Sequence, residues 1–213
     1  MTIGILGTGD MSRALGVKWI KAGHEVCIAG RTASKAQALA DEIGATTGSL
    51  AEAVAACDTL LLAVRSDGAL ETIEAAGGGD GAFAGKTIID CCNPVSIETF
   101  EVMGNEHNSL AERIAAAAPG GHVTKAFNLC QAKVWEMEPP EFDGRTLVVP
   151  FCGDDAGARS TAAELIRAVG CEPLDLGELR YARHLEPMAA IVISLLFRGH
   201  PPHSVFNWIS VKS

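Results

Sequence analysis

The sequence predicts an α/β protein built on a parallel β-sheet with helices on both faces. Short apolar segments rich in β-branched residues alternate along the chain with segments of helical periodicity. The apolar segments are nearly continuous hydrophobic runs, which is typical of strands that are covered on both sides. The chain has 213 residues, 48% of them hydrophobic, so it is long enough to bury a large core.

The first half of the chain supplies most of the predicted strands. The run TIGILG (2–7) predicts a buried strand, and the apolar positions of residues 11–22 recur at helical spacing up to Gly23. The run AAGGGDGAFAG (75–85) predicts a flexible surface loop. The other elements expected in this half are strands at 24–30, 58–64, 86–90 and 122–127 and a helix at 34–43.

A second part of the chain begins near residue 142. Its expected elements are a strand at 145–153, a helix at 154–170, a short extended piece at 171–177 and a long helix at 179–197, bent at Pro187. We therefore expect a main domain over residues 1–141 and a small C-terminal α/β extension over residues 142–213, packed on it.

The charge of the chain narrows the classes of ligand. Its formal net charge is −9, whereas proteins that bind nucleic acids are usually basic, so we expect no nucleic-acid partner and only local anion sites. His200 and His203 have no third ligand nearby in the sequence, so we expect no metal site.

The cysteines and the apolar runs indicate the cellular compartment of the protein. There are seven cysteines, an odd number, with no CxxC motif, which favours reduced and buried thiols over disulfides, including the neighbouring Cys91 and Cys92. The N-terminus lacks a signal-like segment, and the apolar run at 188–197 is too short to span a bilayer. We expect a soluble cytoplasmic protein without a membrane partner.

A glycine turn follows the first predicted strand and opens the first predicted helix. Gly7 permits the tight turn, Gly9 lets a pyrophosphate approach the backbone, and the amides at the helix N-terminus favour an anion. Ser12 takes the third position of the motif, where a small residue lets the helix pack on the strand. Asp10 brings a negative charge close to the phosphates, unless it caps the helix. The residues expected to bind a dinucleotide here are Gly7, Thr8, Gly9, Asp10 and Met11.

The residues after the second strand favour NADP over NAD. An NAD site needs an acidic residue about 20 residues after the glycines to hold the ribose hydroxyls, but no acid occurs here before Asp41. Instead Arg31 offers a planar fork to a 2′-phosphate, Thr32 a hydroxyl and Lys35 a point charge. Because Asp10 brings a negative charge close to the phosphates, we predict that Asp10→Asn tightens the binding of NADPH.

The carboxyl ends of the later strands are the expected walls of the ligand crevice, because ligands bind there in such sheets. Asn93 and Asn128 are candidates for hydrogen bonds to a ribose or a carboxamide. Pro94 and Phe127 could pack on ring faces, although the first could equally fix a turn and the second belong to the core. The other candidates at these ends are Ala63, Val64 and Arg65, and Lys125, which would be a proton donor if it did not pair with an acid.

Over nearly its whole length the chain resembles the NADP oxidoreductases of the coenzyme F420-dependent type. The resemblance lies in "IGILGTGDMSRALGVKWIKAGHEVCIAGR", "DCCNPV", "VPFCGDDAGAR" and "LIRAVGCEPLDLGELRYARHLEPMAAI", and in the ending "FRG…NWISV". It implies a Rossmann domain with a small C-terminal α/β extension. It also implies that the glycine turn binds NADP together with Arg31, Thr32 and Lys35.

One segment departs from that family. "KAFN" (125–128), with Ala132 and Trp135 after it, is more similar to the reductase domain of STEAP-type metalloreductases, which pass a hydride from NADPH to a flavin. Arg65 stands where the family often has proline. Both changes lie at the expected acceptor pocket, so the resemblance implies NADP(H) but leaves the acceptor open.

The hypothesis is an enzyme that transfers a hydride between NADP(H) and a flat acceptor such as coenzyme F420 or a flavin. Phe127, Asn128 and Met188 would bind this acceptor, and Trp208 would cover it, in a homodimer from the partner chain. One alternative is a reductase of small carbonyl or imine substrates with Lys125 as proton donor, although such enzymes carry a longer helical C-terminal domain. Another alternative is a non-catalytic NADP(H)-sensing protein.

Overall fold

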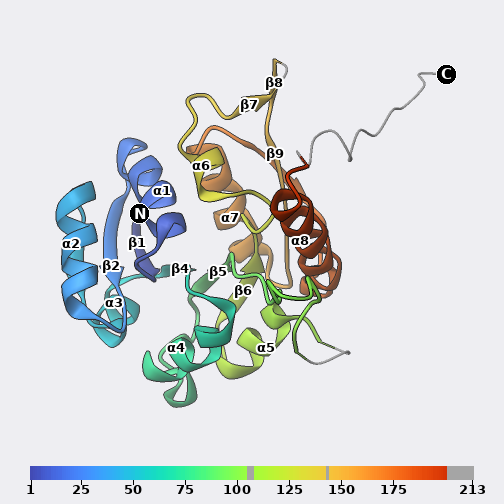
Figure 1. Ribbon diagram of the computed structural model, residues 1–213. Coiled ribbons are helices and arrows are strands. Elements are labelled where there is room, and N and C mark those ends of the chain that lie inside the picture. Colours follow the sequence, from blue (N-terminus) through green and yellow to red (C-terminus); the bar gives the residue numbers. More distant parts are fainter. Residues whose placement is uncertain (105–107, 143, 201–213) are drawn as a thin grey trace.

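In the computed structural model, residues 1–104, 108–142 and 144–200 are described, and they form one α/β unit around an eight-stranded sheet (Figure 1). The strand order is β10-β9-β6-β5-β4-β1-β2-β3, and neighbouring strands are parallel except for β6 and β9. The strands of the sheet are β1 (Thr2–Leu6), β2 (Glu25–Ala29), β3 (Thr46–Gly48), β4 (Thr59–Leu62), β5 (Thr87–Asp90), β6 (His122–Lys125), β9 (Val148–Gly153) and β10 (Glu172–Asp175).

Eight α-helices of the described part connect the strands and cover the sheet. They are α1 (Asp10–Lys21), α2 (Ala33–Ile43), α3 (Leu50–Ala56), α4 (Ala69–Ala75), α5 (Leu110–Ala117), α6 (Ala132–Trp135), α7 (Ala156–Ala168) and α8 (Ala182–Phe197). The smaller elements are the 3₁₀ turns η1 (Ser66–Gly68), η2 (Gly78–Asp80) and η3 (Leu179–Tyr181) and the hairpin of β7 (Glu141–Phe142) and β8 (Arg145–Thr146). No helix among the described residues has the length and apolar character needed to cross a bilayer.

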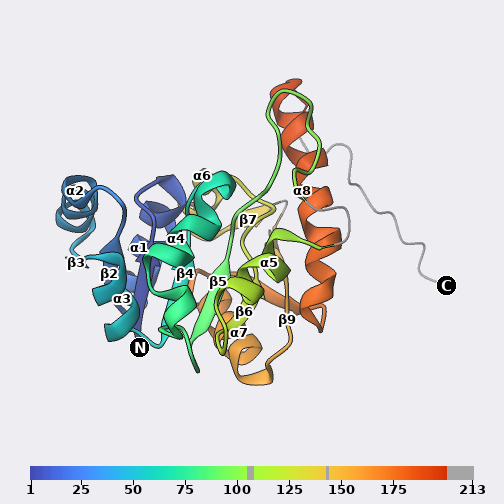
Figure 2. The ribbon, with the colours of Figure 1, turned by 90° about the horizontal axis from the view of Figure 1, so that it is seen from below.

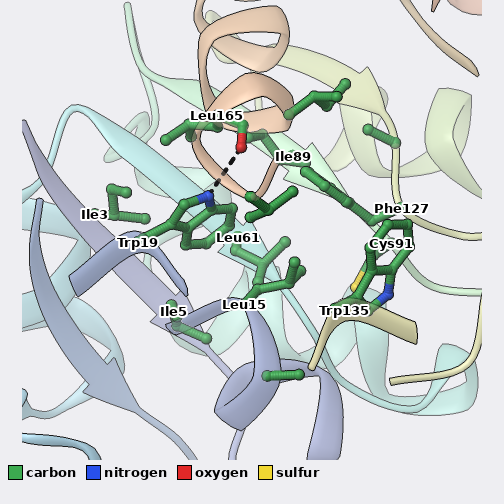
Figure 3. Packing of buried hydrophobic residues seen from close by; sticks show 14 of the residues in the cluster. Ile3, Ile5, Leu15, Trp19, Leu61, Ile89, Cys91, Phe127, Trp135 and Leu165 are labelled. Carbon is green, nitrogen blue, oxygen red and sulfur yellow. Dashed lines mark hydrogen bonds between the residues drawn. The ribbon is translucent and has the colours of Figure 1, made fainter. Parts of the chain in front are cut away.

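Each face of the sheet has its own apolar core, because successive residues of a strand point to opposite sides. Ile3 and Ile5 of β1 pack under α1, α2 and α7, whereas Leu6 packs under α3, α4 and α5. In the first core, shown in Figure 3, Trp19 of α1 is fully buried and its indole Nε1 donates a hydrogen bond to the Leu165 carbonyl of α7 at 3.1 Å. The expected doubly wound α/β fold is therefore confirmed.

The structure corrects two expectations about the elements. The segment 75–85 is anchored, because it contains η2 and places Phe83 in the core with no exposed surface. The sheet also has one antiparallel pair, in which Thr124 faces Gly153 and Lys125 faces Cys152. The chain between β6 and β9 passes through α6 and the β7–β8 hairpin, and this connection returns beside β6 in the opposite direction.

The C-terminal elements continue the main sheet. β9 pairs with β6, and β10 is joined to β9 through α7 as a parallel neighbour. The expected boundary at residues 141–142 falls within the β7–β8 hairpin, and a division of the chain into two domains there stays a prediction. All seven cysteines are free, and all but the half-buried Cys130 are buried, as the composition indicated.

Candidate functional site

The glycine turn after β1 has no room for a side chain at its first position. Gly7 has φ +145°, and a Cβ atom placed there would collide with the carbonyl oxygen of Ala63 at the end of β4. Its amide donates to the Ala29 carbonyl of β2 at 2.8 Å. Around Gly9, in contrast, a Cβ atom would meet nothing within 4 Å. The turn is thus fixed against two strands and leaves an open space over the second glycine.

That open space faces the start of α1. Gly9 is the N-cap residue of the helix and no side chain caps it, so the first amides of α1 remain available to an anion. A phosphate group fits this cradle, because it would take the place of the missing cap and benefit from the positive end of the helix dipole.

Asp10 does not cap the helix, which corrects one of the two roles considered for it. It is the first residue of α1, its side chain is 81% exposed, and its carboxylate lies 2.9 Å from the Arg13 guanidinium. Arg13 also pairs with Glu42 of α2 at 2.7 Å. Ser12, by contrast, is fully buried, and its hydroxyl has no hydrogen-bond partner in the described part of the chain.

The three polar residues predicted to bind a 2′-phosphate are exposed together at the end of β2. Thr32 is the N-cap of α2 without a side-chain cap bond, and the first turn of this helix holds no acidic residue. The guanidinium of Arg31 lies close to Gly68 of η1 and 3.8 Å from the Glu71 carboxylate. Lys35 lies in the first turn of α2. An exposed cluster of cations and hydroxyls suits a phosphate.

The turn after β4 borders the same region. Ala63 and Val64 are half-buried, and Arg65 is exposed. The guanidinium of Arg65 forms an ion pair with Asp67 at 2.9 Å, and this hydrogen bond lowers the pKa of Asp67 below its usual value. Arg65 therefore already has a partner within its own turn.

A pocket of about 220 Å³ opens at the carboxyl ends of the strands, next to the glycine turn. Met11 contributes the edge nearest the turn, and the segments after β5 and β6 together with α8 form the other walls. Among the described residues that line the pocket, the thiols of Cys91 and Cys130 are the only ionisable side chains. The lining residues are Met11, Cys91, Asn93, Phe127, Asn128, Leu129, Cys130, Gln131, Ala132, Ala189, Val192, Ile193 and Leu196.

Two asparagines join the walls of this pocket. The Asn93 amide donates to the backbone oxygen of Asn128 at 2.7 Å, and the Asn128 amide donates to Oδ1 of Asn93 at 3.0 Å. Asn128 also donates to the Leu185 carbonyl of α8 at 3.0 Å. The carboxamide oxygen of Asn128 is buried and has no protein partner within the described ranges. Both predicted residues thus lie at the pocket, and they connect three of its walls.

Phe127 is first of all a core residue. It is 1% exposed, with ring centroids 6.1 Å from Trp19 and 5.3 Å from Trp135, both in edge-on geometry. Figure 3 shows Phe127 and Trp135 side by side next to Cys91. The backbone of Phe127 is left-handed, with φ +62°, and Phe127 also borders the pocket. The alternative in which Phe127 belongs to the core therefore describes its surroundings. Pro94 is buried, and its role in a turn or at a ring face stays a prediction.

Lys125 does not line the pocket. Its ammonium group is fully buried, 2.8 Å from Asp90 and 3.0 Å from Glu186, and it also donates to the Cys92 carbonyl. Burial alone would lower the pKa of Lys125, but the two carboxylates outweigh burial and raise it above its usual value. Lys125 therefore pairs with acids, as the alternative had it, and it does not lie where it could give a proton to a substrate in the pocket.

The two thiols after β5 are held as neutral groups. Burial raises the pKa of Cys91 to about 12, and burial likewise raises the pKa of Cys92. The Cys92 thiol lies 3.2 Å from the Val64 carbonyl, toward which it donates. A thiol in this state is a poor nucleophile, which agrees with the interpretation of these residues as buried structural cysteines.

The helix α8 contributes to the pocket through other residues than expected. Met188 is 41% exposed and is absent from the lining, whereas Ala189, Val192, Ile193 and Leu196 face the pocket. Their spacing of three, four and seven residues is that of one helix face, a signal that the sequence already contained. Trp208 and His203 lie outside the described residues.

Comparisons with known proteins find similar sequences among NADP-dependent oxidoreductases. Residues 2–94 match the model of the family described as NADP oxidoreductase, coenzyme F420-dependent. The chain is 32% identical over 194 residues to the metalloreductase STEAP3 of Rattus norvegicus, covering 91% of this chain and 37% of that protein. It is 27% identical over 216 residues to the F420-dependent NADP reductase of Methanothermobacter thermautotrophicus, covering 93% and 90% of the two chains.

Among solved structures, a protein of Arthrobacter sp. FB24 described as an F420-dependent NADP reductase aligns with a TM-score of 0.82 and 25% identity. The alignment covers 93% of this chain and 95% of that one. The chain therefore spans nearly the whole length of the reductases but well under half of the STEAP relative. The resemblance to both groups that the sequence motifs indicated is confirmed.

Proposed function

The chain is related to the coenzyme F420-dependent NADP oxidoreductases, and from this premise we propose that it transfers a hydride between NADP(H) and a flat ring acceptor. Coenzyme F420 and flavins are acceptors of this kind. Bound NADPH would supply the hydride from its nicotinamide ring. The protein's own residues would bind the two partners, align their rings and keep water out of the space between them.

The nucleotide half of this proposal rests on two features of the turn region. The uncapped start of α1 and the open space over Gly9 suit a pyrophosphate. Arg31, Thr32 and Lys35 suit the 2′-phosphate that distinguishes NADP from NAD. The pocket begins at Met11, next to the turn, so a nicotinamide that extends from the pyrophosphate would reach it.

The single observation that carries the acceptor class is the chemistry of the pocket lining. Among the described residues it consists of apolar side chains, carboxamides and neutral thiols, with no general acid. Reduction of a carbonyl or an imine needs a proton close to the reacting atom, whereas a ring acceptor can take the hydride and exchange protons with solvent. Carboxamides can also hydrogen-bond the edge of such a ring. The pocket thus favours the ring acceptor over the carbonyl and imine alternative.

The test is a titration of the purified protein with NADPH and NADH, followed by turnover assays with F420, FMN, FAD, a ferric chelate, a quinone, a cyclic imine and a keto compound. We expect NADPH to bind at least about tenfold more tightly than NADH, because the 2′-phosphate adds charge-assisted hydrogen bonds. Arg31→Ala should remove this preference while leaving NADH binding nearly unchanged. Equal binding of both nucleotides would contradict the assigned phosphate site.

The acceptor assays separate the remaining alternatives. Turnover of one ring acceptor supports the proposed enzyme. Turnover of a cyclic imine or a keto compound, with none of the ring compounds reduced, would favour the carbonyl and imine reductase. Tight NADPH binding without turnover of any compound would favour the sensing protein.

A further inference from the structure

We propose that Glu186 of α8 is a positioning residue for the acceptor pocket, because it fixes the helix that forms one wall. The residue does not line the pocket itself. It acts through α8, whose residues Ala189, Val192, Ile193 and Leu196 do. The acceptor named in this inference rests on the proposed function, whereas the effect of Glu186 on α8 does not.

Glu186 is 1% exposed and joins three separate elements. Its carboxylate accepts hydrogen bonds from the amides of Leu110 at 2.9 Å and Ala111 at 3.2 Å, which are the first two residues of α5. It also accepts a bond from the ammonium of Lys125, at the end of β6, at 3.0 Å. A carboxylate at a helix N-terminus and beside a buried cation is held strongly in one orientation.

The same cluster fixes the neighbouring wall of the pocket. Lys125 also binds Asp90 and the carbonyl of Cys92, while Asp90 accepts the amide of Cys92 at 2.8 Å. Both polar groups of the Cys92 backbone are therefore held, one residue before Asn93. One buried network thus sets the segment after β5 and the helix α8 relative to each other.

The distal part of α8 depends on this attachment. Pro187 follows Glu186 directly and cannot donate the hydrogen bond to the preceding turn, which weakens the helix at this point. From Ile191 to Phe197 no residue of the helix is buried, and Figure 2 shows this end beside the loop that follows β5. The Phe197 ring lies 5.6 Å from that of Phe100 in this loop. The buried polar attachment of this wall consequently lies at the turn that contains Glu186.

Glu186→Gln is the informative substitution. It leaves Lys125 paired with Asp90, so no buried charge loses its last partner, and the protein should fold. One carboxylate oxygen accepts both the Ala111 amide and the Lys125 ammonium, and the other accepts the Leu110 amide. An NH₂ group in place of either oxygen therefore faces a donor, the Leu110 amide in one orientation and Lys125 with Ala111 in the other. Replacement of Lys125 would be less useful, because it would leave two buried carboxylates without their cation.

The matched control is Glu112→Gln. Glu112 also connects α5 to α8, through Arg183 at 2.6 Å, but this ion pair is partly exposed to solvent. Both variants are the same chemical change in a carboxylate that links the same two helices. Only Glu186 belongs to the buried network that includes the end of β6.

Two measurements test the inference. Hydrogen exchange of the amides at 188–197 should become about tenfold faster in Glu186→Gln and stay unchanged in Glu112→Gln, with α1 unaffected in both. The dissociation constant of FMN, measured in the presence of NADP⁺, should rise about tenfold in Glu186→Gln alone, while that of NADPH stays within about twofold. A residue with a merely structural role would weaken both ligands together.

The two arms separate this inference from the proposed function. Unchanged exchange at 188–197 in Glu186→Gln overturns the positioning role, whatever happens to FMN. Faster exchange with an unchanged FMN constant overturns it as well, because the wall would then not shape the site. If the unmodified protein binds no flavin and no F420, the proposed acceptor is wrong, and the exchange experiment still decides whether Glu186 fixes α8. Should Glu186→Gln not fold, Glu186→Asp, which keeps the charge but is one methylene shorter, replaces it in both measurements.

Discussion

At the scale of single residues, the turn after β1 combines a strict steric requirement with an unusual charge. Gly7 cannot be replaced, since its neighbour Ala63 occupies the place of any side chain. The side chain of Asp10 is not confined by neighbouring atoms in this way, because it is exposed at the start of α1. An acid at this position stabilises the helix but repels a phosphate. Its ion pair with Arg13 offsets part of this repulsion without removing it.

Asp10→Asn should therefore tighten NADPH binding about two- to fivefold at low ionic strength, and less at high salt, because exposed charges are screened. Fluorescence titration at two salt concentrations measures the effect. Asp41→Asn, on the exposed side of α2, is a control for the general change in net charge. Unchanged or weaker binding in the first variant would mean that Asp10 does not face the pyrophosphate.

At the scale of elements, the sequence was sufficient for features with a local signal and insufficient for long-range ones. Apolar periodicity and flanking glycines predicted β1, α1, α2 and α7. The run TTG of β3 is too short for such a signal. The residue pattern of a strand does not say in which direction it runs beside its neighbours, so the antiparallel pairing of β9 with β6 could not be predicted. The partners of Lys125 lie 35 and 61 residues away along the chain, and no local pattern connects them.

The partly exposed ion pair between Glu112 of α5 and Arg183 of α8 should make the stability of the protein depend on acid pH. A hydrogen bond from Arg183 lowers the pKa of Glu112 to about 2, from an ordinary value of 4.5. A carboxyl whose pKa falls on folding stabilises the protein above its unfolded value, and this contribution is lost as the pH drops from 4.5 toward 2. Because Glu112 lies near solvent, its contribution should not exceed about 1 kcal/mol.

Urea unfolding of the unmodified protein and Glu112→Gln at pH 7 and pH 3 measures this contribution. The difference between the two proteins should shrink by about half or more at the lower pH. Arg183→Gln should reproduce the loss, and the double variant should add little to it. A difference that is the same at both pH values would exclude the ion pair as its source.

At the scale of the whole molecule, the site lies where the sheet meets α8, and the apolar surface beside it suggests a partner. Ile97 in the loop after β5 is 66% exposed, and Ile191 and Phe197 of α8 are 51% and 66% exposed. These residues lie on adjacent segments (Figure 2). We propose that a second copy of the chain covers them in a homodimer, since apolar patches of this kind mark interfaces.

Sedimentation of the purified protein should give twice the mass of one chain. Ile191→Glu should shift it toward the monomer, because a charge buried in an interface loses its hydration. Leu174→Glu, a similar change at an exposed position of the sheet edge, should leave the mass unchanged. A monomer at all concentrations would overturn the homodimer.

The order of the strands has a consequence for synthesis on the ribosome. The six strands β3-β2-β1-β4-β5-β6 all come from the first 125 residues, so most of the sheet can assemble while later segments are still being translated. Until α8 emerges, Lys125 has Asp90 as its sole carboxylate partner, and the first amides of α5 lack the acceptor that Glu186 provides. Among the described residues, α8 is the last helix to be synthesised, and it completes this buried network. The pocket wall that α8 forms therefore takes shape only after the six strands have been made.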